Sequence, residues 1–544
     1  MKAYLQELQH ELAGTVMDKQ DALDYFSTDG SIFAIEPSGI VYPKHTGDVQ
    51  NVVKFVAERA AGGKQLSIVA RGRGTDQSGG ALGDGLMVVF PAHMNKMLKF
   101  DKRSVTVQPG MLYSSLQQIL HSHERFLPPY PSSIEFSSIG GAVANNAAGE
   151  KTIKYGATRN YVEKLQVVLS DGSVIETKRL SARELSRKKG LSTLEGEIYR
   201  QVDGLINEHR ALIRQAAPGT SKNSAGYALW DVKRADGSFD LGQLIVGSQG
   251  TLGIITEITL KTMPYLPKTT LVVGFFDDLA KAGQAVTRLQ KLKPSALELV
   301  DYHLLEFLRH DHPGILDGLV PEKLPQIAFL IEFDDQSQLR QTVKSRRAQQ
   351  IVRTFGYDLK VATKPREQEA LWNIRRSAAA VIWMTRGKEK ALPIIEDGVV
   401  PIEKLSEFLE KTYRLLKKYD LEIAVWGHAG DANFHIQPFL DLSKKKDREK
   451  VFDLADDFYD MVIKLGGSTC GEHNDGLMRS PYLRKLFGSE VYDLFCEVKH
   501  IFDPHDILNP GKKVDISRED LKKRLREERH EYSMRHLYDH FPNN

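Results

Sequence analysis

Short runs of branched apolar residues alternate with amphipathic segments through the first half of the chain. Four runs with glycine-rich or polar borders lie at 65–70, 85–90, 104–108 and 165–169. Buried strands have this composition and these borders. Residues 110–121, which follow Pro109, have the pattern of a helix, and the polar segment 1–30 predicts a helical lead-in. We therefore expect strands and helices to alternate up to about residue 265.

Prolines at 264 and 267 mark a boundary, and the pattern changes beyond it. Apolar strands at 270–275 and 327–333 are separated by helical segments, and a further helix is expected near 448–466, which together indicate an α+β domain. A chain of 544 residues exceeds what one core usually organises, so we predict several domains. The predicted divisions are 1–34 (helical lead-in), 35–265, 266–513 and 514–544 (a charged, solvated helical tail).

Composition narrows the possible partners and compartments. Basic and acidic side chains number 74 and 71, so the net charge of +3 gives no reason to expect nucleic acid binding. The two cysteines, Cys470 and Cys496, are too few for a disulfide framework or for an iron–sulfur cluster held by this chain alone. The N-terminus lacks a signal-peptide pattern, and no apolar run is long enough for a transmembrane helix. We expect a cytoplasmic protein, with peripheral membrane attachment left open.

A glycine-rich segment, RGRGTDQSGG at 71–80, follows a predicted strand. Such a turn exposes backbone N–H groups that can hold phosphate oxygens, and Arg71 or Arg73 could add a charge-assisted bond. The segment matches neither the GxGxxG dinucleotide motif nor a P-loop. By itself it favours a tight turn over phosphate binding.

Two further runs of small residues change this interpretation. They read IGGAVANNAAG at 139–149, followed by YGATRN at 155–160, and GSQGTLGIITE at 247–257. Small residues let the backbone pack directly against a large flat ligand. One extended cofactor that crosses all three segments explains them more economically than three independent packing sites.

Histidines and a carboxylate gather in two later segments. GHAGDANFH at 427–435 predicts a strand–turn–strand passage that brings His428 and His435 together, and GGSTCGEHNDG at 466–476 places Glu472 beside His473. Two imidazoles and one carboxylate are a ligand set for a catalytic divalent ion with open positions. Zinc, manganese and iron all accept this set, and the spacing is not that of a standard zinc motif.

Taken in order, these segments resemble the FAD-linked oxidases of the vanillyl-alcohol oxidase superfamily. The resemblance is to the branch with D-lactate dehydrogenase, D-2-hydroxyglutarate dehydrogenase and the glycolate oxidase flavin subunit, and it covers about residues 35–513. The other matching segments are PPYPSS at 128–133, KNSAGY at 222–227, LWNIRR at 371–376 and DPHDILNPGK at 503–512. The ordered set is far more specific than any one segment.

The resemblance implies a fold and a cofactor site. Residues 35–265 should form an FAD-binding domain of the p-cresol methylhydroxylase (PCMH) type with two α/β subdomains, and 266–513 an α+β substrate domain, before the C-terminal helical segment. The implied FAD contacts are Arg71, Gly72, Arg73, Gly74, Thr75, Asp76, Pro131, Ser132, Ser133, Gly140, Gly141, Asn145, Gly149, the segment Gly250, Gly253 and Ile254, and finally Asn509 and Lys512.

The resemblance also assigns catalytic roles. His428, His435 and Glu472 match the metal ligands, His473 the catalytic base, and Arg375 the arginine that holds the substrate carboxylate. These residues would oxidise a small D-2-hydroxy acid, of the D-lactate, glycolate or D-2-hydroxyglutarate class, to the 2-oxo acid. The metal would lower the hydroxyl pKa, His473 would take the proton, and a hydride would pass to the flavin.

Some positions depart from the family pattern. Asn474 replaces the glycine that commonly follows the base, and Ile395 stands where some hydroxyglutarate enzymes carry a lysine, which argues against a dicarboxylate. The EDGVVP segment at 396–401 is closer to long oxidases that carry an additional iron–sulfur half. We expect the electrons of this chain to pass to a separate iron–sulfur, quinone or cytochrome acceptor.

Two other classes of function remain open at this point. One is a different flavoenzyme of the same fold, such as an alkylglycerone-phosphate synthase-like transferase or a sugar-lactone oxidase. The other is a non-catalytic flavin-bearing subunit that relays electrons within a larger complex. The GHAGDANFH and GEHNDG segments argue against a lactone oxidase, and the full set of His428, His435, Glu472, His473 and Arg375 argues against a relay subunit.

Overall fold

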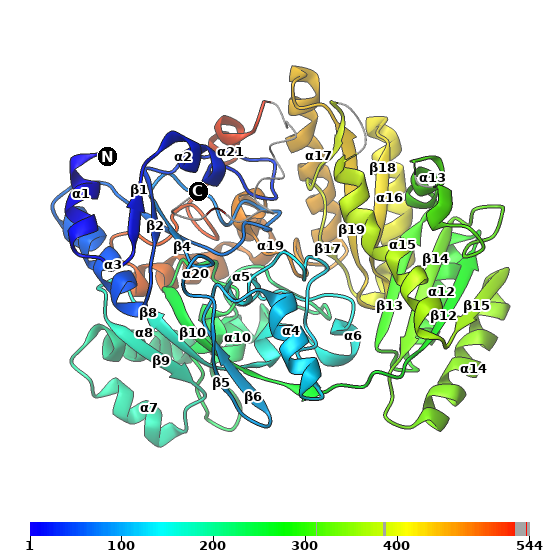
Figure 1. Cartoon of the computed structure of the whole chain (residues 1–544), viewed down its shortest axis with the longest axis horizontal. Coiled ribbons are helices and arrows are strands. Elements are labelled where there is room, and N and C mark those ends of the chain that lie inside the picture. Colours follow the sequence, from blue (N-terminus) through cyan, green and yellow to red (C-terminus); the bar gives the residue numbers. More distant parts are fainter. Residues whose placement is uncertain (312, 385–387, 528–539, 541–544) are drawn as a thin grey trace.

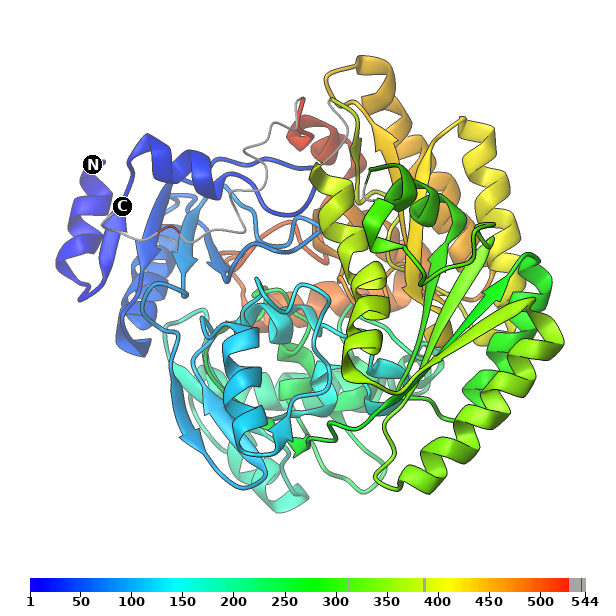
Figure 2. The ribbon, with the colours of Figure 1, turned by 45° about the vertical axis from the view of Figure 1, so that its right-hand side comes forward.

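The computed structural model describes residues 1–311, 313–384, 388–527 and 540. Figure 1 shows two halves side by side, the first built from the blue to green-cyan part of the chain and the second from the green to yellow part. The orange and red C-terminal segments return to the first half, as Figure 2 shows from another side. No described helix is both long and apolar enough to cross a membrane.

A small four-stranded sheet forms the N-terminal layer. Its order is β1 (Thr15–Met17), β2 (Gly39–Tyr42), β4 (Leu86–Val89), β3 (Ile68–Arg71), with only β1 antiparallel to its neighbour. The predicted helical lead-in is therefore wrong in part. Besides α1 (Ala3–His10) and α2 (Gln20–Phe26) it contains β1, and Leu5 and Leu8 of α1 pack into the core of this sheet. Residues 1–34 belong structurally to the first layer.

A five-stranded antiparallel sheet forms the second layer. Its order is β5 (Met97–Phe100), β6 (Ser104–Val107), β10 (Ile254–Lys261), β8 (Val162–Val168), β9 (Val174–Lys178). The predicted strands at 104–108 and 165–169 correspond to β6 and β8, and the predicted helix to α4 (Tyr113–Ser122). Apolar residues of this sheet share one core with α4 and α8 (Leu194–Glu208).

An eight-stranded sheet organises the second half. Seven strands follow the order β15 (Asp358–Ala362), β12 (Thr270–Phe276), β14 (Ile327–Phe333), β13 (Ala296–Asp301), β18 (Ile423–His428), β19 (Asn433–Leu440), β16 (Lys390–Ala391), and β17 (Gly398–Val399) also pairs with β19. Side chains alternate between two cores, with Val272 facing one and Leu271 and Val273 the other. The helices α12 (Leu279–Gln290), α14 (Gln338–Phe355), α16 (Leu405–Tyr419) and α17 (Lys445–Lys464) belong to the first side, and α13 (Tyr302–Asp311) and α15 (Pro365–Met384) to the other.

The chain then returns to the first half. Helix α20 (Ser489–Phe502) contacts α8, and the backbone of Asn509 and Ile507 pairs with Ile68 of β3. The tail is not simply a solvated helix as predicted. It forms α21 (Arg518–Arg524), after which the buried Arg526 side chain donates to the carbonyls of Phe33 and Asp29. The remainder of the predicted tail, 528–539 and 541–544, lies outside the described residues.

Candidate functional site

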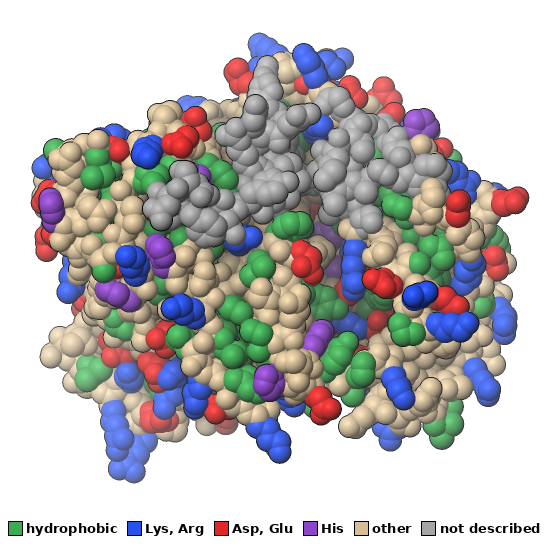
Figure 3. Space-filling model, in the orientation of Figure 1, with side chains coloured by type: hydrophobic (Ala, Val, Ile, Leu, Met, Phe, Trp, Pro, Cys, Tyr) green, Lys and Arg blue, Asp and Glu red, His purple; other side chains and the backbone are tan. Residues whose placement is uncertain are grey.

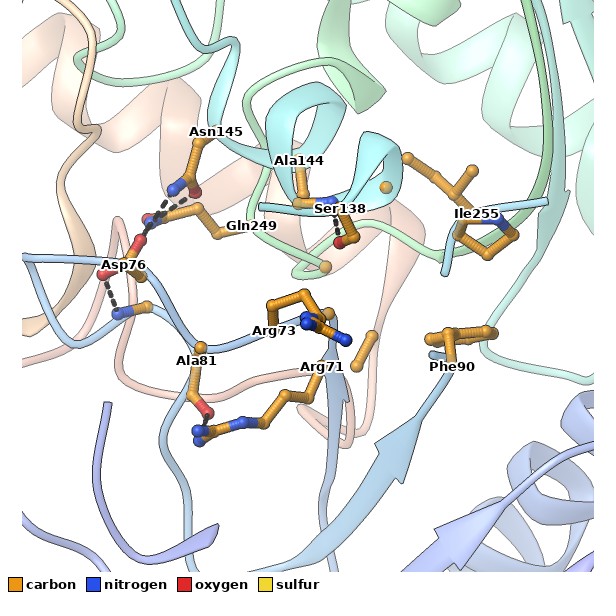
Figure 4. A pocket seen from close by; sticks show the side chains of 18 of the residues that line it. Arg71, Arg73, Asp76, Ala81, Phe90, Ser138, Ala144, Asn145, Gln249 and Ile255 are labelled. Carbon is orange, nitrogen blue, oxygen red and sulfur yellow. Dashed lines mark hydrogen bonds between the residues drawn. The ribbon is translucent and has the colours of Figure 1, made fainter. Parts of the chain in front are cut away.

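The three glycine-rich segments line one cavity, at the ends of strands from both sheets of the first half (Figure 4). The space between its walls, which opens to solvent, amounts to ≈ 770 Å³. Its walls include residues 70–76, five residues of the second segment (Ser138, Gly140, Gly141, Ala144 and Asn145) and four of the third (Gln249, Gly250, Gly253 and Ile255). This convergence is what a single extended cofactor requires.

The Asp76 carboxylate holds these segments together (Figure 4). Its Oδ1 accepts hydrogen bonds from the backbone of Ser78 and Gly80, and its Oδ2 accepts one from Asn145 Nδ2 at 2.7 Å and one from Gln249 Nε2 at 3.3 Å. Gln249 also donates to Asn145 Oδ1 at 3.1 Å. Asp76 and Asn145, both predicted cofactor contacts, therefore also fix the shape of the cavity.

Glycine is required in the loop after β3. Gly74 has φ +71°, and a Cβ there would clash with the guanidinium of Arg71, while a Cβ on Gly72 would clash with Ser138 Oγ. Within the described part of the chain, the backbone N–H groups of Gly72, Gly74 and Thr75 donate no hydrogen bond. They are available to an anionic ligand such as a cofactor phosphate.

Arg71 was one of two arginines that could bond a cofactor phosphate, and its guanidinium contacts backbone carbonyls. Its guanidinium is buried and donates to the carbonyls of Phe26, Thr28 and Ala81, so it braces the loop from behind instead of reaching a phosphate. Burial lowers the pKa of Arg71. Of the two loop arginines, Arg73 is the more exposed, and its Nε donates to the carbonyl of Phe136 at 3.3 Å.

The structure places the predicted cofactor residues in two groups. Those that line the cavity are Arg71, Gly72, Arg73, Gly74, Thr75, Asp76, Gly140, Gly141, Asn145, Gly250 and Gly253. Pro131, Ser132, Ser133, Gly149, Ile254, Asn509 and Lys512 lie outside its lining, which contains Ile255 instead of Ile254.

Asn509 and Lys512 lie behind the cavity wall. Asn509 Nδ2 donates to the carbonyls of Gly80 and Gln249, at 2.9 and 2.6 Å. Lys512 Nζ donates to the carbonyl of Leu82 at 2.5 Å, and burial lowers its pKa to about 7. The returning C-terminal segment thus holds the glycine-rich loops by their carbonyls.

The predicted histidine ligands stand on two paired strands. His428 ends β18 and His435 lies on β19, joined by the short turn η4 (Ala429–Asp431), so the expected strand–turn–strand passage is confirmed. The loop that follows α17 brings Glu472 to them. Its Oε1 lies 3.0 Å from His428 Nε2 and 3.2 Å from His435 Nε2, and all three side chains are buried.

The protonation of this cluster suits a metal ion. Burial lowers the pKa of His435 to about 4, so its imidazole is neutral and its nitrogens can act as ligands. For His428, burial opposes protonation, yet the Glu298 and Glu472 carboxylates raise its pKa. His428 Nδ1 lies 2.8 Å from Glu298 Oε1, a carboxylate contact typical of metal-binding histidines. Two carboxylates thus favour a positive charge at the imidazole, which a cation could supply.

The surrounding charges support the same interpretation. Five buried carboxylates belong to Glu298, Glu396, Asp397, Asp431 and Glu472, and three buried cations to Lys222, Arg375 and Arg479. With neutral imidazoles, these side chains leave two negative charges uncompensated, and buried charges require compensation. A divalent ion between His428, His435 and Glu472 would balance them, so the residues present fit such an ion.

His473 stands at the edge of this cluster and keeps 22% of its side chain exposed. Its Nδ1 contacts Glu396, whose other oxygen pairs with the buried Arg479, while its Nε2 lies 3.4 Å from Glu472 Oε1. Burial lowers the pKa of His473, whereas the nearby Asp397 and Glu472 carboxylates raise it. The net result is a raised pKa. Glu396 thus orients His473, in the way a carboxylate orients the imidazole of a general base.

Asn474, the departure from the family pattern, joins the two parts of the site. It has φ +66°, a conformation that asparagine tolerates better than most residues. Its Nδ2 donates to the carbonyls of Asn145 and Gly247, at 3.0 and 2.9 Å, and Ser78 Oγ donates to the His473 carbonyl. The loop that carries the expected base is therefore hydrogen-bonded to the loops of the cavity.

Arg375 is buried beside the cluster. Its Nε and Nη2 lie 3.0 and 2.8 Å from Glu298 Oε2, so Glu298 contacts both Arg375 and His428. The neighbouring Arg376 is half exposed and pairs with Glu150, which also accepts a bond from Tyr130 OH at 2.7 Å. Arg375 reaches the site as predicted, but one edge of its guanidinium is already occupied.

Several residues that contact the predicted ligands and the predicted base were not identified from the sequence. Glu396 lies in the EDGVVP segment and Lys222 in KNSAGY, and no role in the site was predicted for either residue. Lys222 Nζ donates to Glu472 Oε2 at 2.8 Å. Glu298, inside the apolar strand β13, offered one signal, a charged residue within a buried strand.

Comparison with known proteins agrees with this geometry. Residues 37–178 match an FAD binding domain, and 266–513 match the C-terminal domain of FAD linked oxidases. The chain is 29% identical to a D-2-hydroxyglutarate dehydrogenase of Pantoea ananatis over 89% of its length, but spans about half (49%) of that relative. It is also 29% identical to the glycolate oxidase subunit GlcD of Bacillus subtilis, covering 91% of this chain and 92% of that one, and 27% identical to a D-lactate dehydrogenase of Archaeoglobus fulgidus, covering 88% and 92%.

Solved structures share the fold at low identity. The p-cresol methylhydroxylase structure with bound substrate superposes with a TM-score of 0.65 at 15% identity, covering 94% of this chain and 96% of that one. An alkyldihydroxyacetonephosphate synthase superposes with a TM-score of 0.62 at 15% identity, covering 94% and 84%. The expected fold class, a PCMH-type FAD-binding domain with an α+β second domain, is confirmed.

Proposed function

We propose, given that this chain belongs to the FAD-linked oxidase family, that it is an FAD-dependent dehydrogenase that oxidises a small D-2-hydroxy acid to the 2-oxo acid. The substrate class is that of D-lactate, glycolate and D-2-hydroxyglutarate, the acids that relatives of this chain are named for. The observation that carries the proposal is the convergence of His428, His435 and Glu472 beside a histidine whose loop is hydrogen-bonded to the flavin cavity.

The chain's residues would hold two groups. The glycine-rich cavity would hold FAD, which supplies a hydride acceptor when bound. His428, His435 and Glu472 would hold a divalent ion, zinc, manganese or iron, which supplies Lewis-acid chemistry when bound. Both fit the charges and the open backbone donors described above.

His473 is the proposed base for the substrate hydroxyl. Because Nδ1 contacts the Glu396 carboxylate, the proton of the neutral ring is expected on Nδ1 and the lone pair on Nε2. Nε2 faces the metal-ligand cluster, where the hydroxyl has to lie. Glu396, neutralised on its other side by Arg479, stabilises the imidazolium after it has taken the proton.

Arg375 is the proposed contact of the substrate carboxylate. Glu298 fixes the Nε and Nη2 edge of the guanidinium, which leaves Nη1 for a ligand. Holding the carboxylate in one orientation presents one face of the C2 carbon, and this is the source of the expected preference for one enantiomer.

The test is an anaerobic flavin-reduction assay on the FAD-loaded chain. D-lactate, glycolate and D-2-hydroxyglutarate are compared with the L enantiomers of lactate and 2-hydroxyglutarate, before and after treatment with a chelator. We expect at least one D acid or glycolate to bleach the visible absorbance of the flavin, and chelation to remove that activity. A flavin that none of these acids reduces would instead indicate a relay subunit.

A further inference from the structure

Lys222 is a buried ammonium that the first half of the chain contributes to the histidine cluster of the second. Its side chain has no solvent exposure, and its Nζ lies 2.8 Å from Glu472 Oε2 and 3.8 Å from Asp431 Oδ2. The other oxygen of Glu472 faces the imidazoles of His428 and His435. The two oxygens of one carboxylate are thus divided between a lysine and the cluster.

The backbone around Lys222 is fixed against the loop that carries Glu472. Ser224 N donates to the carbonyl of Cys470 at 3.1 Å, Ser224 Oγ to that of Gly471 at 3.0 Å, and Gly226 N to Asp475 Oδ2 at 2.9 Å. The 222–226 segment therefore runs along the 470–475 loop. The backbone from which Lys222 reaches Glu472 is therefore fixed relative to the loop that carries Glu472.

We propose that Lys222 is a positioning residue that restricts Glu472 to one oxygen for metal binding and weakens the hold of the site on its ion. The first effect follows because Oε2 is bonded to the ammonium and only Oε1 faces the histidines. The second follows because a buried positive charge repels a nearby cation. This inference rests on the proposed function, because it presupposes that the cluster binds a divalent ion.

The restriction has a chemical use. A site with two imidazoles and a single carboxylate oxygen leaves positions on the ion open to water or to a hydroxy acid. If Glu472 could offer both oxygens, the second would compete for one of these positions. Lys222 therefore favours exchange of small ligands over tight retention of the metal.

The experiment titrates Co²⁺ into the full FAD-loaded, metal-depleted chain and records both affinity and the visible Co²⁺ spectrum. Lys222→Met should bind Co²⁺ roughly tenfold or more tightly than the unchanged chain, because a repelling charge is lost. Its Co²⁺ bands should differ, because a second oxygen becomes available. Lys222→Arg, which keeps the charge, should return both readouts toward those of the unchanged chain.

A second variant and a matched control separate this role from support of the fold. Asp431→Asn leaves the Lys222 charge to Glu472 alone and should weaken Co²⁺ binding. Lys499 is a comparable control, because its ammonium is buried and lies 2.5 Å from Asp503 and within hydrogen-bonding distance of the carbonyls of Thr251 and Leu508. Lys499→Met should lower the Tm without changing Co²⁺ affinity or spectrum.

The outcomes distinguish this inference from the proposed function. Unchanged or weaker Co²⁺ binding by Lys222→Met would overturn the inference while leaving the metal site in place. If Lys222→Met does not fold, unchanged Co²⁺ binding by Asp431→Asn would overturn it in the same way. If the unchanged chain takes up no Co²⁺ at all, the metal part of the proposed function is wrong and this inference with it.

Discussion

In the flavin cavity the backbone supplies the surface, whereas in the histidine cluster the side chains do. The cavity depends on positions where a Cβ has no room, such as Gly72 and Gly74, and its one carboxylate, Asp76, is satisfied by hydrogen bonds from its own walls. The cluster packs carboxylates, imidazoles and cations together, and its buried carboxylates outnumber its lysine and arginine side chains. One region is therefore sensitive to added atoms and the other to altered charge.

The largest expected effect comes from removing the base while leaving the cavity untouched. His473→Ala should lower the rate of flavin reduction by about 10²–10⁴-fold, the usual range for a general base, because the other two imidazoles that face Glu472, those of His428 and His435, are the proposed metal ligands. FAD content, measured by absorbance, should stay the same, because the His473 side chain is outside the cavity lining. The control is His209→Ala, at the end of α8. Normal reduction in His473→Ala would refute the base assignment.

The next effect tests the carboxylate that contacts the proposed ligand His428 from behind. Glu298→Gln keeps a hydrogen-bond acceptor for His428 Nδ1 but removes the charge, so metal affinity should fall by about 10–100-fold. Glu332, on the adjacent strand β14, offers a matched control, since its buried carboxylate is paired with Lys151. Metal content after dialysis measures both variants. Equal metal retention in Glu298→Gln and Glu332→Gln would show that the charge balance of the cluster is not what binds the ion.

The converse change should damage the cavity and spare the cluster. Gly74→Ala places a Cβ against the Arg71 guanidinium at φ +71°, and we expect FAD affinity to fall about tenfold or more, a loss of about 1.4 kcal/mol. Gly63 has nearly the same φ, +76°, with no atom within 4 Å of its added Cβ. Gly63→Ala therefore carries the backbone strain alone. Fluorescence titration with FAD measures both variants, and similar affinities would mean that the clash is relieved by movement of Arg71.

The same contrast explains how much the sequence could predict. Glycine and other small residues cluster in a sequence mainly where the backbone has to come close to another group. The segments RGRGTDQSGG and IGGAVANNAAG therefore located the cavity directly. The convergence of His428 and His435, the proposed ligands, was likewise predictable, because a glycine-bounded turn between two strands brings them together.

The residues that surround the proposed ligands could not be predicted from the sequence because they come from distant parts of the chain. Lys222 reaches the cluster through the packing of the two halves, whereas Glu298 on β13 and Glu396 beside β17 reach it through strand pairing within the second half. The prediction of a helical N-terminal lead-in was wrong in part for a related reason. Strand β1 has three residues, too few for a periodic pattern, and exists because it pairs with β2.

The smallest expected effect concerns Glu150, which follows the cavity segment and pairs with Arg376 of the second half. Burial raises the pKa of Glu150, but Arg376 outweighs it and lowers the pKa to about 2. A carboxyl group whose folded pKa is depressed stabilises the fold above its unfolded pKa, and this contribution is lost as the pH falls through about 2. Because Arg376 is half exposed, solvent screening reduces the gain, and we expect Glu150→Gln to cost about 1 kcal/mol or less at pH 7. Urea unfolding at several pH values should show this difference shrinking below about pH 4.5, the ordinary carboxyl range, whereas the exposed Glu163→Gln should show no difference at any pH. A cost that stays constant into acid would mean that Glu150 joins the two halves by packing and not by charge.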